Sequence, residues 1–158
     1  MTPESRRHPR STAQVFGHPL HAMLIPFPIV GFIGAFVTDL VYWQTANLMW
    51  QYFSIWLITM GLVMGGLAAL MGLIDYFGDS AVRTRPAATP HMLLNIGAML
   101  IELVNAFVHS RDGWTAVVPQ GLILSGITVV LLMVSAWLGA SLSYKDGVGV
   151  SDTAGVAK

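Results

Sequence analysis

Two long stretches of the chain contain no charged residue. No Asp, Glu, Lys or Arg occurs from Leu40 to Ile74, nor from Gly113 to Tyr144. Only 10% of all residues are charged, whereas 54% are hydrophobic, and the mean hydropathy is +0.65. A transmembrane helix needs about 20 consecutive, mostly apolar residues. The sequence therefore predicts an integral membrane protein and excludes a soluble domain of ordinary composition.

Polar and turn residues divide the apolar sequence into four windows of transmembrane length. The connections between the windows are short, which favours antiparallel neighbours. We therefore expect an all-α, integral membrane four-helix bundle with up-down-up-down topology and a single domain, residues 18–143. A basic tail (residues 1–17) precedes this domain and a flexible tail (residues 144–158) follows it. The predicted helices cover about residues 19–43, 52–77, 90–109 and 119–143.

Basic residues outside the windows predict the orientation of the bundle. Lys and Arg collect on the cytoplasmic side of membrane proteins. Here they flank the face shared by the two termini and the 78–89 loop, whereas the opposite loops contain only Arg111. Both termini are therefore expected in the cytoplasm, with an aromatic belt near the outer face. The basic residues are Arg6, Arg7, Arg10, Arg83, Arg85, Lys145 and Lys158, and the aromatic residues are Tyr42, Trp43, Trp50, Tyr52, Trp56 and Trp114.

Composition and missing motifs exclude several classes of function. The chain has no cysteine, which rules out disulfides, thiolate metal sites and cysteine nucleophiles. Its formal net charge is +0, so no basic face for nucleic acid is implied. No GxGxxG, GxxxxGKS/T or HExxH motif occurs, which argues against nucleotide-dependent enzymes and zinc proteases of that type. A metal ion or cofactor would have to use His, Asp, Glu or Met.

Four ionisable residues lie where the predicted helices begin or end at one membrane face. The alternation of the spans brings His18, His21, Asp75 and His91 to this face, whichever side of the membrane it is. Haem iron with two imidazole ligands needs one His from each of two facing helices, whereas a metal site needs three or four His or carboxylate ligands. This set can supply either, with Asp75 orienting an imidazole. The alternative is that the histidines only cap helices and contact lipid headgroups.

A second pattern of polar residues follows the third predicted helix. At 100° per residue, these residues fall within an arc of about 80° and extend over about 27 Å, nearly the hydrocarbon thickness. Asp39 in the first helix is expected to pair with His109 or Asn105. Such a seam predicts either proton movement or hydrogen bonds that hold the helices together. The seam consists of His91, Asn95, Glu102, Asn105 and His109.

Glu102 would lie near the centre of the bilayer. No Lys or Arg is available at that depth, so an ionised carboxylate there would have no basic partner. We therefore expect Glu102 to be a neutral carboxylic acid that is hydrogen-bonded to a neighbouring helix.

The first predicted helix begins with the segment GHPLHAMLIPFP, residues 17–28. Pro19 is compatible with the first turn of a helix, because its missing N–H group would have no helical partner there. Pro26 and Pro28 each free a carbonyl group four residues before them, and they are expected to bend or loosen the helix. The bend would lean His18 and His21 toward the other residues of the cluster.

Small residues predict close packing of two of the helices. They permit neighbouring backbones in a membrane to approach one another, and no chemistry is assigned to them. They are Gly61, Gly65, Ala68 and Gly72 in the second helix, and Gly121, Ser125, Ser135 and Gly139 in the fourth.

Three segments of the chain form a recognisable pattern: HPLHAMLIPFPIVGFIGAFVTDL at residues 18–40, GLIDYF at 72–77 and HMLLN at 91–95. They resemble the bacterial domain of unknown function 2231 family, over roughly residues 17–143. The resemblance implies a small four-span protein of the bacterial inner membrane. It implies more weakly a redox setting, since some relatives are joined to Rieske-type iron–sulfur domains. The matching positions, to which the family assigns no role, are His18, His21, Asp39, Asp75, His91 and Asn95.

Four hypotheses follow. The leading one is electron transfer by a b-type haem, or a metal ion, held near the cytoplasmic face by His91 and one of His18 or His21, with a redox partner protein or larger complex. The second is a proton or ion pathway along the seam, with Glu102 as its central relay. The third is a non-catalytic scaffold or accessory subunit whose polar groups only specify packing. The fourth is a metal-dependent membrane hydrolase. A homo-oligomer is compatible with each.

Overall fold

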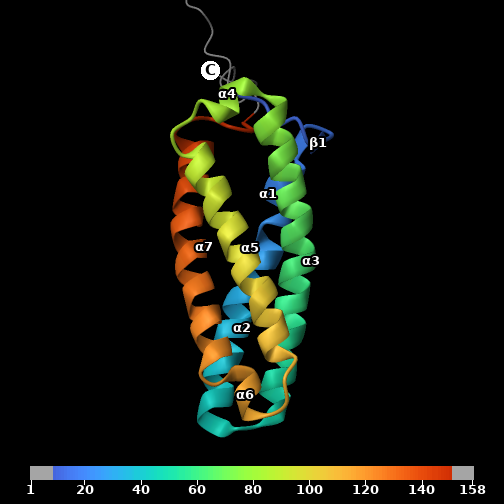
Figure 1. Cartoon of the computed structure of the whole chain (residues 1–158). Helices are drawn as coiled ribbons and strands as arrows, with labels where there is room; N and C mark the ends of the chain where they lie inside the picture. The colour runs from blue at the N-terminus through green and yellow to red at the C-terminus, as the bar shows by residue number, and fades with distance from the viewer. Residues whose placement is uncertain (1–8, 151–158) are drawn as a thin grey trace, which may run out of the picture.

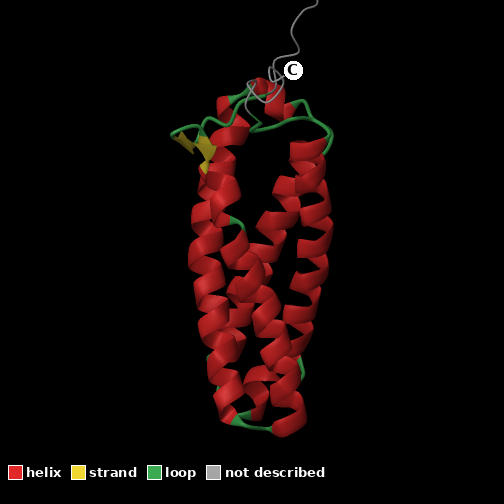
Figure 2. Ribbon diagram, turned by 180° about the vertical axis from the view of Figure 1, so that it is seen from behind, coloured by secondary structure: helices red, strands yellow, loops and turns green. Residues whose placement is uncertain are grey.

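The computed structural model describes residues 9–150, which form long helices lying side by side (Figure 1), with a short strand pair at one end (Figure 2). The long helices are α2 (Pro26–Thr45), α3 (Leu48–Gly78), α5 (Ala88–His109) and α7 (Gln120–Tyr144). The short elements are β1 (Gln14–Val15), β2 (His18–Pro19), α1 (Leu20–Leu24), α4 (Ser80–Arg83) and α6 (Trp114–Val117). Arg6, Arg7 and Lys158, with the outer parts of both predicted tails, lie outside the described residues.

Four stretches within residues 9–150 are long and apolar enough to cross a membrane: Leu20–Thr45, Leu48–Gly78, Ala88–His109 and Trp114–Tyr144. They correspond to the four predicted windows. One difference is at the start of α3, which begins at Leu48 instead of residue 52. The reason is local, because the side chain of Asn47 accepts a hydrogen bond from the backbone N–H of Met49 at 3.0 Å and caps the helix.

The first span is interrupted after little more than one turn. α1 ends at Leu24 and α2 begins at Pro26, which has no N–H group to continue the helical hydrogen bonds. Ile25, between them, keeps helical backbone angles, and the N–H of Ile29 donates to its carbonyl at 3.4 Å. The prolines were expected to bend or loosen the helix, and the observed effect is a local interruption between α1 and α2. His21 therefore lies in a short helix of its own.

The long helices pack in the cyclic order α2, α3, α5, α7, and α1 packs on α3. α2 and α5 are therefore diagonally opposite each other, as are α3 and α7. We call one end of the bundle, where α4 and the strand pair lie, the α4 end, and the opposite end the α6 end (Figure 1). Polar residues on the first span and on α5 thus face each other across the bundle axis.

An apolar layer crosses the interior of the bundle. It consists of the buried residues Phe32, Ala98 and Leu132, with Leu62, Met99 and Leu131 packed against them. All four spans contribute to it, so it separates the interior of the α4 end from that of the α6 end. Many large apolar side chains point outward instead, among them Phe107 and Trp137, as lipid-facing helices require.

The described parts of both predicted tails are held against the α4 end. The Ser11 hydroxyl donates to the Asp75 carboxylate at 2.9 Å, and the Ala13 backbone N–H donates to the same carboxylate at 2.7 Å. After α7 ends at Tyr144, the N–H of Gly149 donates to the carbonyl of Pro9 at 3.0 Å. These contacts form a strap over the end of the bundle.

Candidate functional site

His21 of α1 and His91 of α5 face each other near the α4 end. Their ring centroids are 6.2 Å apart and their ring planes are nearly perpendicular, at 87°. Both side chains are half-buried. Because α1 leads into α2, which is diagonal to α5, the two imidazoles come from opposite corners of the bundle. We call them the histidine pair.

A backbone carbonyl of another helix orients each imidazole of the histidine pair. His21 Nδ1 lies 2.7 Å from the carbonyl oxygen of Ala68 on α3, and His91 Nδ1 lies 2.9 Å from that of Ser135 on α7. A carbonyl oxygen only accepts hydrogen bonds, so Nδ1 carries the proton in both rings. In the neutral imidazole, Nε2 then has a free lone pair. Histidines that ligate metals have this arrangement, with the second nitrogen donating to a carbonyl or carboxylate.

The hydrogen bonds of Asn95 leave Nε2 of His91 available. Asn95 Nδ2 lies 2.6 Å from Ser135 Oγ, 2.8 Å from the His91 carbonyl and 3.3 Å from His91 Nε2. An amide nitrogen has two hydrogens, so it cannot serve three acceptors at full strength, and the contact to Nε2 is the longest. In the described part of the chain, the hydrogen bond of the His21 ring is made by Nδ1. Both Nε2 atoms can therefore accept a ligand.

Two helix glycines lie directly against the histidine pair. A Cβ atom added at Gly72 of α3 would lie 3.0 Å from Cε1 and Nδ1 of His21. One added at Gly139 of α7 would lie 3.0 Å from Cε1 of His91. These distances are shorter than the optimal separation of about 3.5–4.0 Å between carbon atoms. Any larger residue at either position would therefore push an imidazole out of place.

His18 and Asp75, the other two residues of the predicted cluster, have different surroundings. His18 is exposed in β2, opposite Val15 of β1. Asp75 accepts hydrogen bonds from Ser11 and Ala13, whereas the imidazoles are oriented by backbone carbonyls. No group of three His, Cys, Asp or Glu side chains among residues 9–150 is placed to hold a metal ion.

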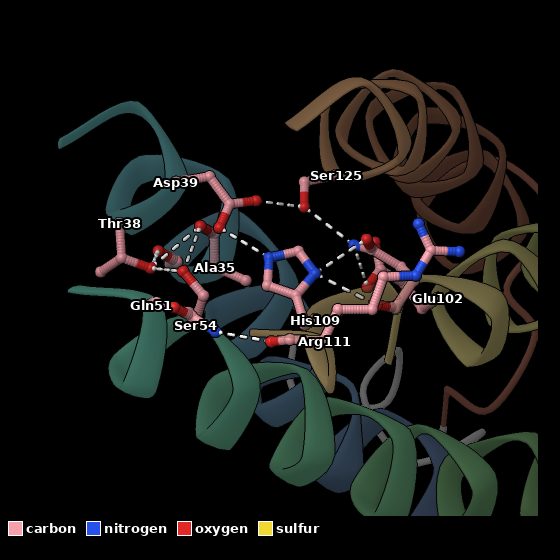
Figure 3. A network of polar contacts seen from close by, with 11 residues as sticks. Ala35, Thr38, Asp39, Gln51, Ser54, Glu102, His109, Arg111 and Ser125 are labelled. Atoms are coloured by element: carbon pink, nitrogen blue, oxygen red, sulfur yellow. Dashed lines mark hydrogen bonds and ion pairs between the residues drawn. The ribbon is translucent and has the colours of Figure 1, made fainter. Parts of the chain in front are cut away.

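A second group of polar side chains is buried between the apolar layer and the α6 end. Figure 3 shows the contacts among Asp39, His109 and Ser125 in this group. His109 Nε2 lies 2.9 Å from Asp39 Oδ1, which confirms the expected pairing, and the Ser125 hydroxyl donates to Asp39 Oδ2 at 2.6 Å. Asn105 Nδ2 donates to Ser125 Oγ at 2.9 Å and to Glu102 Oε2 at 3.2 Å. We call this group the polar layer; its members, all buried, are Asp39, Glu102, Asn105, His109, Ser125 and Thr128.

The single hydroxyl hydrogen of Ser125 fixes the direction of these hydrogen bonds. It is donated to Asp39, so Ser125 accepts from Asn105 Nδ2. Asn105 Oδ1 then faces His109 Nδ1 at 3.0 Å, and the Asn105 carbonyl lies 3.1 Å from the same nitrogen. Both oxygens are acceptors, so His109 Nδ1 carries a proton. A further proton must lie between His109 Nε2 and Asp39 Oδ1, and the pair is neutral whichever atom holds it.

The predicted seam on α5 is divided by the apolar layer. His91 and Asn95 lie on the α4 side of this layer, whereas Glu102, Asn105 and His109 belong to the polar layer. Ala98 lies on α5 between these two groups and is buried in the apolar layer. Its side chain cannot form a hydrogen bond. The described side chains therefore do not form an unbroken line of hydrogen bonds across the bundle.

The sequence predicted the ionisable residues and the pairing of Asp39 with His109, but not the other groups that hold them. The sequence marks Ser125, Ser135, Gly72 and Gly139 only as small residues of packing faces, yet two of them hydrogen-bond the polar groups and two leave room for imidazoles. The carbonyl of Ala68 has no side-chain signal at all. Only the helix pairing, which brings these positions opposite histidines, could have revealed their roles.

Four apolar helical spans around buried polar groups define a helical membrane protein. A family model described as "Predicted membrane protein (DUF2231)" matches residues 17–152. The chain belongs to this family, as the resemblance predicted. Searches of curated proteins and of solved structures found no match to the chain.

Proposed function

We propose that the protein binds a b-type haem between His21 and His91 and transfers electrons in the membrane, alone or as a subunit of a larger redox assembly. The observation that carries this proposal is the histidine pair. Its two imidazoles come from opposite corners of the bundle, and each is held through Nδ1 by a carbonyl of another helix. That tautomer leaves Nε2 free to ligate iron.

The number of histidines favours haem over a bare metal ion. The macrocycle of haem supplies the other iron ligands, so two imidazoles suffice, whereas protein metal sites use three or four side chains. His21 and His91 would hold the haem iron through Nε2, the ring nitrogen that the hydrogen bonds to the Ala68 and Ser135 carbonyls leave free.

When bound, haem iron would accept and release one electron. The residues of the chain would hold the ligands: the carbonyls of Ala68 and Ser135 fix the rotation of the two rings and strengthen Nε2 as an electron-pair donor. Asn95 ties Ser135 to the backbone of His91, which keeps the second imidazole attached to α7.

We infer that the spans cross the bacterial inner membrane alternately, with the α4 end and both termini in the cytoplasm. Support comes from charge, because the loop that contains Arg83 and Arg85 lies at the α4 end, whereas Arg111 lies at the α6 end. Trp50 and Trp114 also lie at the α6 end, where an outer aromatic belt is expected. The histidine pair would then be close to cytoplasmic or membrane-bound redox partners.

Absorption spectra of purified variants test the proposal. Wild-type protein, expressed with haem available, should show a Soret band that is lost in His21→Ala and in His91→Ala. His18→Ala is the matched control, because His18 is exposed in β2, and it should keep the band. A wild-type protein that never binds haem, or single variants that bind it as well as the wild type, would contradict the proposal.

Two of the other hypotheses differ from the haem proposal in what they predict or in the support they receive. A scaffold or accessory subunit would show no haem in the wild type and would lose assembly when His21 or His91 is replaced. A proton path across the whole bundle receives no support from the side chains, because the apolar layer interrupts the seam.

A further inference from the structure

The polar layer contains buried atoms that the protein leaves without hydrogen bonds. Four buried side-chain atoms within residues 9–150 have no partner, and three of them are at this end of the bundle: Gln51 Oε1, Glu102 Oε1 and Thr128 Oγ1. Thr128 of α7 faces Glu102 of α5. Buried polar atoms normally have a hydrogen-bond partner, and where the protein supplies none, a bound water molecule does so. A carboxylate oxygen can also take up a proton. The three atoms therefore indicate a site for mobile protons and water.

The charges of the surrounding side chains indicate that Glu102 is protonated. The titratable side chains that face it are His109 on its own helix and Asp39 on α2, and these two already form a neutral pair. α7 brings only the hydroxyls of Ser125 and Thr128 to the site, and no long helix contains Lys or Arg. An ionised Glu102 would be an uncompensated charge in a low-dielectric interior, which costs far more than protonation. Protonated Glu102 can instead donate toward Thr128.

Polar groups lead from Glu102 toward the α6 end. Beside the polar layer, Thr38 Oγ1 lies 2.7 Å from Ser54 Oγ (Figure 3). One turn of α3 closer to the surface, Gln51 Nε2 donates to the carbonyl of Arg111 at 3.1 Å, and Arg111 is exposed. In the opposite direction Glu102 meets the apolar layer. Within residues 9–150, the polar groups beside Glu102 therefore approach the surface at the α6 end and not at the α4 end.

We propose that the polar layer is a proton-binding site that opens to the α6 end alone, with Glu102 as its terminal proton acceptor. Binding forms one O–H bond on the Glu102 carboxylate from a proton delivered through water near Gln51, Ser54 and the Asp39–His109 pair. Because the ionised carboxylate is costly, the proton is exchanged and not lost: when this O–H bond breaks, a new one forms with a proton that arrives by the same route. The inference concerns residues outside the histidine pair and does not depend on haem.

Infrared spectroscopy of the protein in lipid nanodiscs tests this proposal. The C=O stretching band of a protonated carboxylic acid that disappears in Glu102→Gln identifies the neutral Glu102 side chain at neutral pH. Transfer from H₂O to D₂O shifts this band, and the time course of the shift measures proton exchange. Thr128→Val should move the band in H₂O, because the carboxyl group loses the hydroxyl group that faces it.

A matched pair of variants tests where the site opens. Ser54 and Ser135 are both buried serines, but they lie on opposite sides of the apolar layer. Ser54→Ala should slow exchange at Glu102 at least tenfold, whereas Ser135→Ala should leave it unchanged. If Ser54→Ala does not fold, Gln51→Leu serves as the alternative variant, and it should slow proton exchange at Glu102 in the same way. Absence of a Glu102-dependent C=O band would overturn the proton site, and equal exchange rates in the two serine variants would overturn its opening at the α6 end.

Discussion

His109 Nε2 lies 2.9 Å from Oδ1 of Asp39, and neither side chain has any exposed surface. The two residues come from diagonal helices, α5 and α2, and the pair is held in a ring of hydrogen bonds with Ser125 and Asn105. The number of residues from His21 to Asp39 in the first span equals the number from His91 to His109 in α5, and it corresponds to about five helical turns. The same two corners of the bundle therefore supply the histidine pair and the Asp39–His109 pair.

Removal of the Asp39 carboxylate should destabilise the bundle strongly. Asp39→Ala leaves His109 and Ser125 without their partner in a buried site, and it should cost about 3–5 kcal/mol of unfolding free energy. Asp39→Asn is the matched control, because its amide can donate to Nε2 of neutral His109 and accept from Ser125, at a cost of about 1 kcal/mol. Thermal or denaturant unfolding in detergent measures both. Equal stabilities of the two variants would show that the ring of hydrogen bonds contributes little.

Replacement of Gly72 should weaken the histidine pair without unfolding the protein. Gly72→Ala places a methyl group 3.0 Å from the His21 ring, so the imidazole must shift and haem affinity should fall at least tenfold. Gly66→Ala on the same helix is the control, because an added Cβ meets no atom within 4 Å there. It should retain haem and gain up to about 1 kcal/mol from helix propensity. Haem titrations of the two variants decide between these outcomes, and similar affinities would refute the steric role of Gly72.

Asp75 should hold the N-terminal strap to the bundle. Asp75→Ala removes the acceptor of the Ser11 hydroxyl and the Ala13 N–H, so backbone amides of residues 9–19 should exchange with deuterium faster. Asp112→Ala, in an exposed loop at the α6 end, should leave that segment unchanged. Hydrogen–deuterium exchange with mass spectrometry reads out both. If the strap is equally protected in Asp75→Ala, other contacts hold it in place.

The absence of cysteine allows a direct test of orientation. Ser80→Cys at the α4 end and Asp112→Cys at the α6 end each introduce a single thiol at an exposed position. A membrane-impermeant maleimide added to intact spheroplasts should label Asp112→Cys only, and Ser80→Cys should be labelled after the membrane is opened. The reverse pattern would place both termini on the outer side.

The spans could be predicted because lipid leaves few alternatives. Apolar stretches of bilayer length must be helical to satisfy their backbone groups, so the length and charge of each window were sufficient to predict the four spans. The helix ends depended on local chemistry that is harder to recognise, such as the cap at Asn47. Likewise, the break at Ile25 was expected from Pro26, but its form was not.

The candidate site could be predicted only in part. Alternation of the spans brought His21 and His91 to one end, but His18 belongs to a strand pair that no periodicity indicated. The atoms that orient the two imidazoles are backbone carbonyls, which every residue carries, so the sequence cannot single them out. Helix rotation decides these contacts, and it depends on side-chain packing among all four helices.

The most direct measurement is a titration of purified wild-type protein with haem, followed by the Soret absorbance, beside the His21→Ala/His91→Ala double variant. A haem site at the histidine pair predicts that the wild type saturates at a fixed haem-to-protein ratio, whereas the double variant, still folded by circular dichroism, shows no saturable binding. Identical titration curves for the two proteins, or no saturation in the wild type, would contradict the assignment of a haem to His21 and His91.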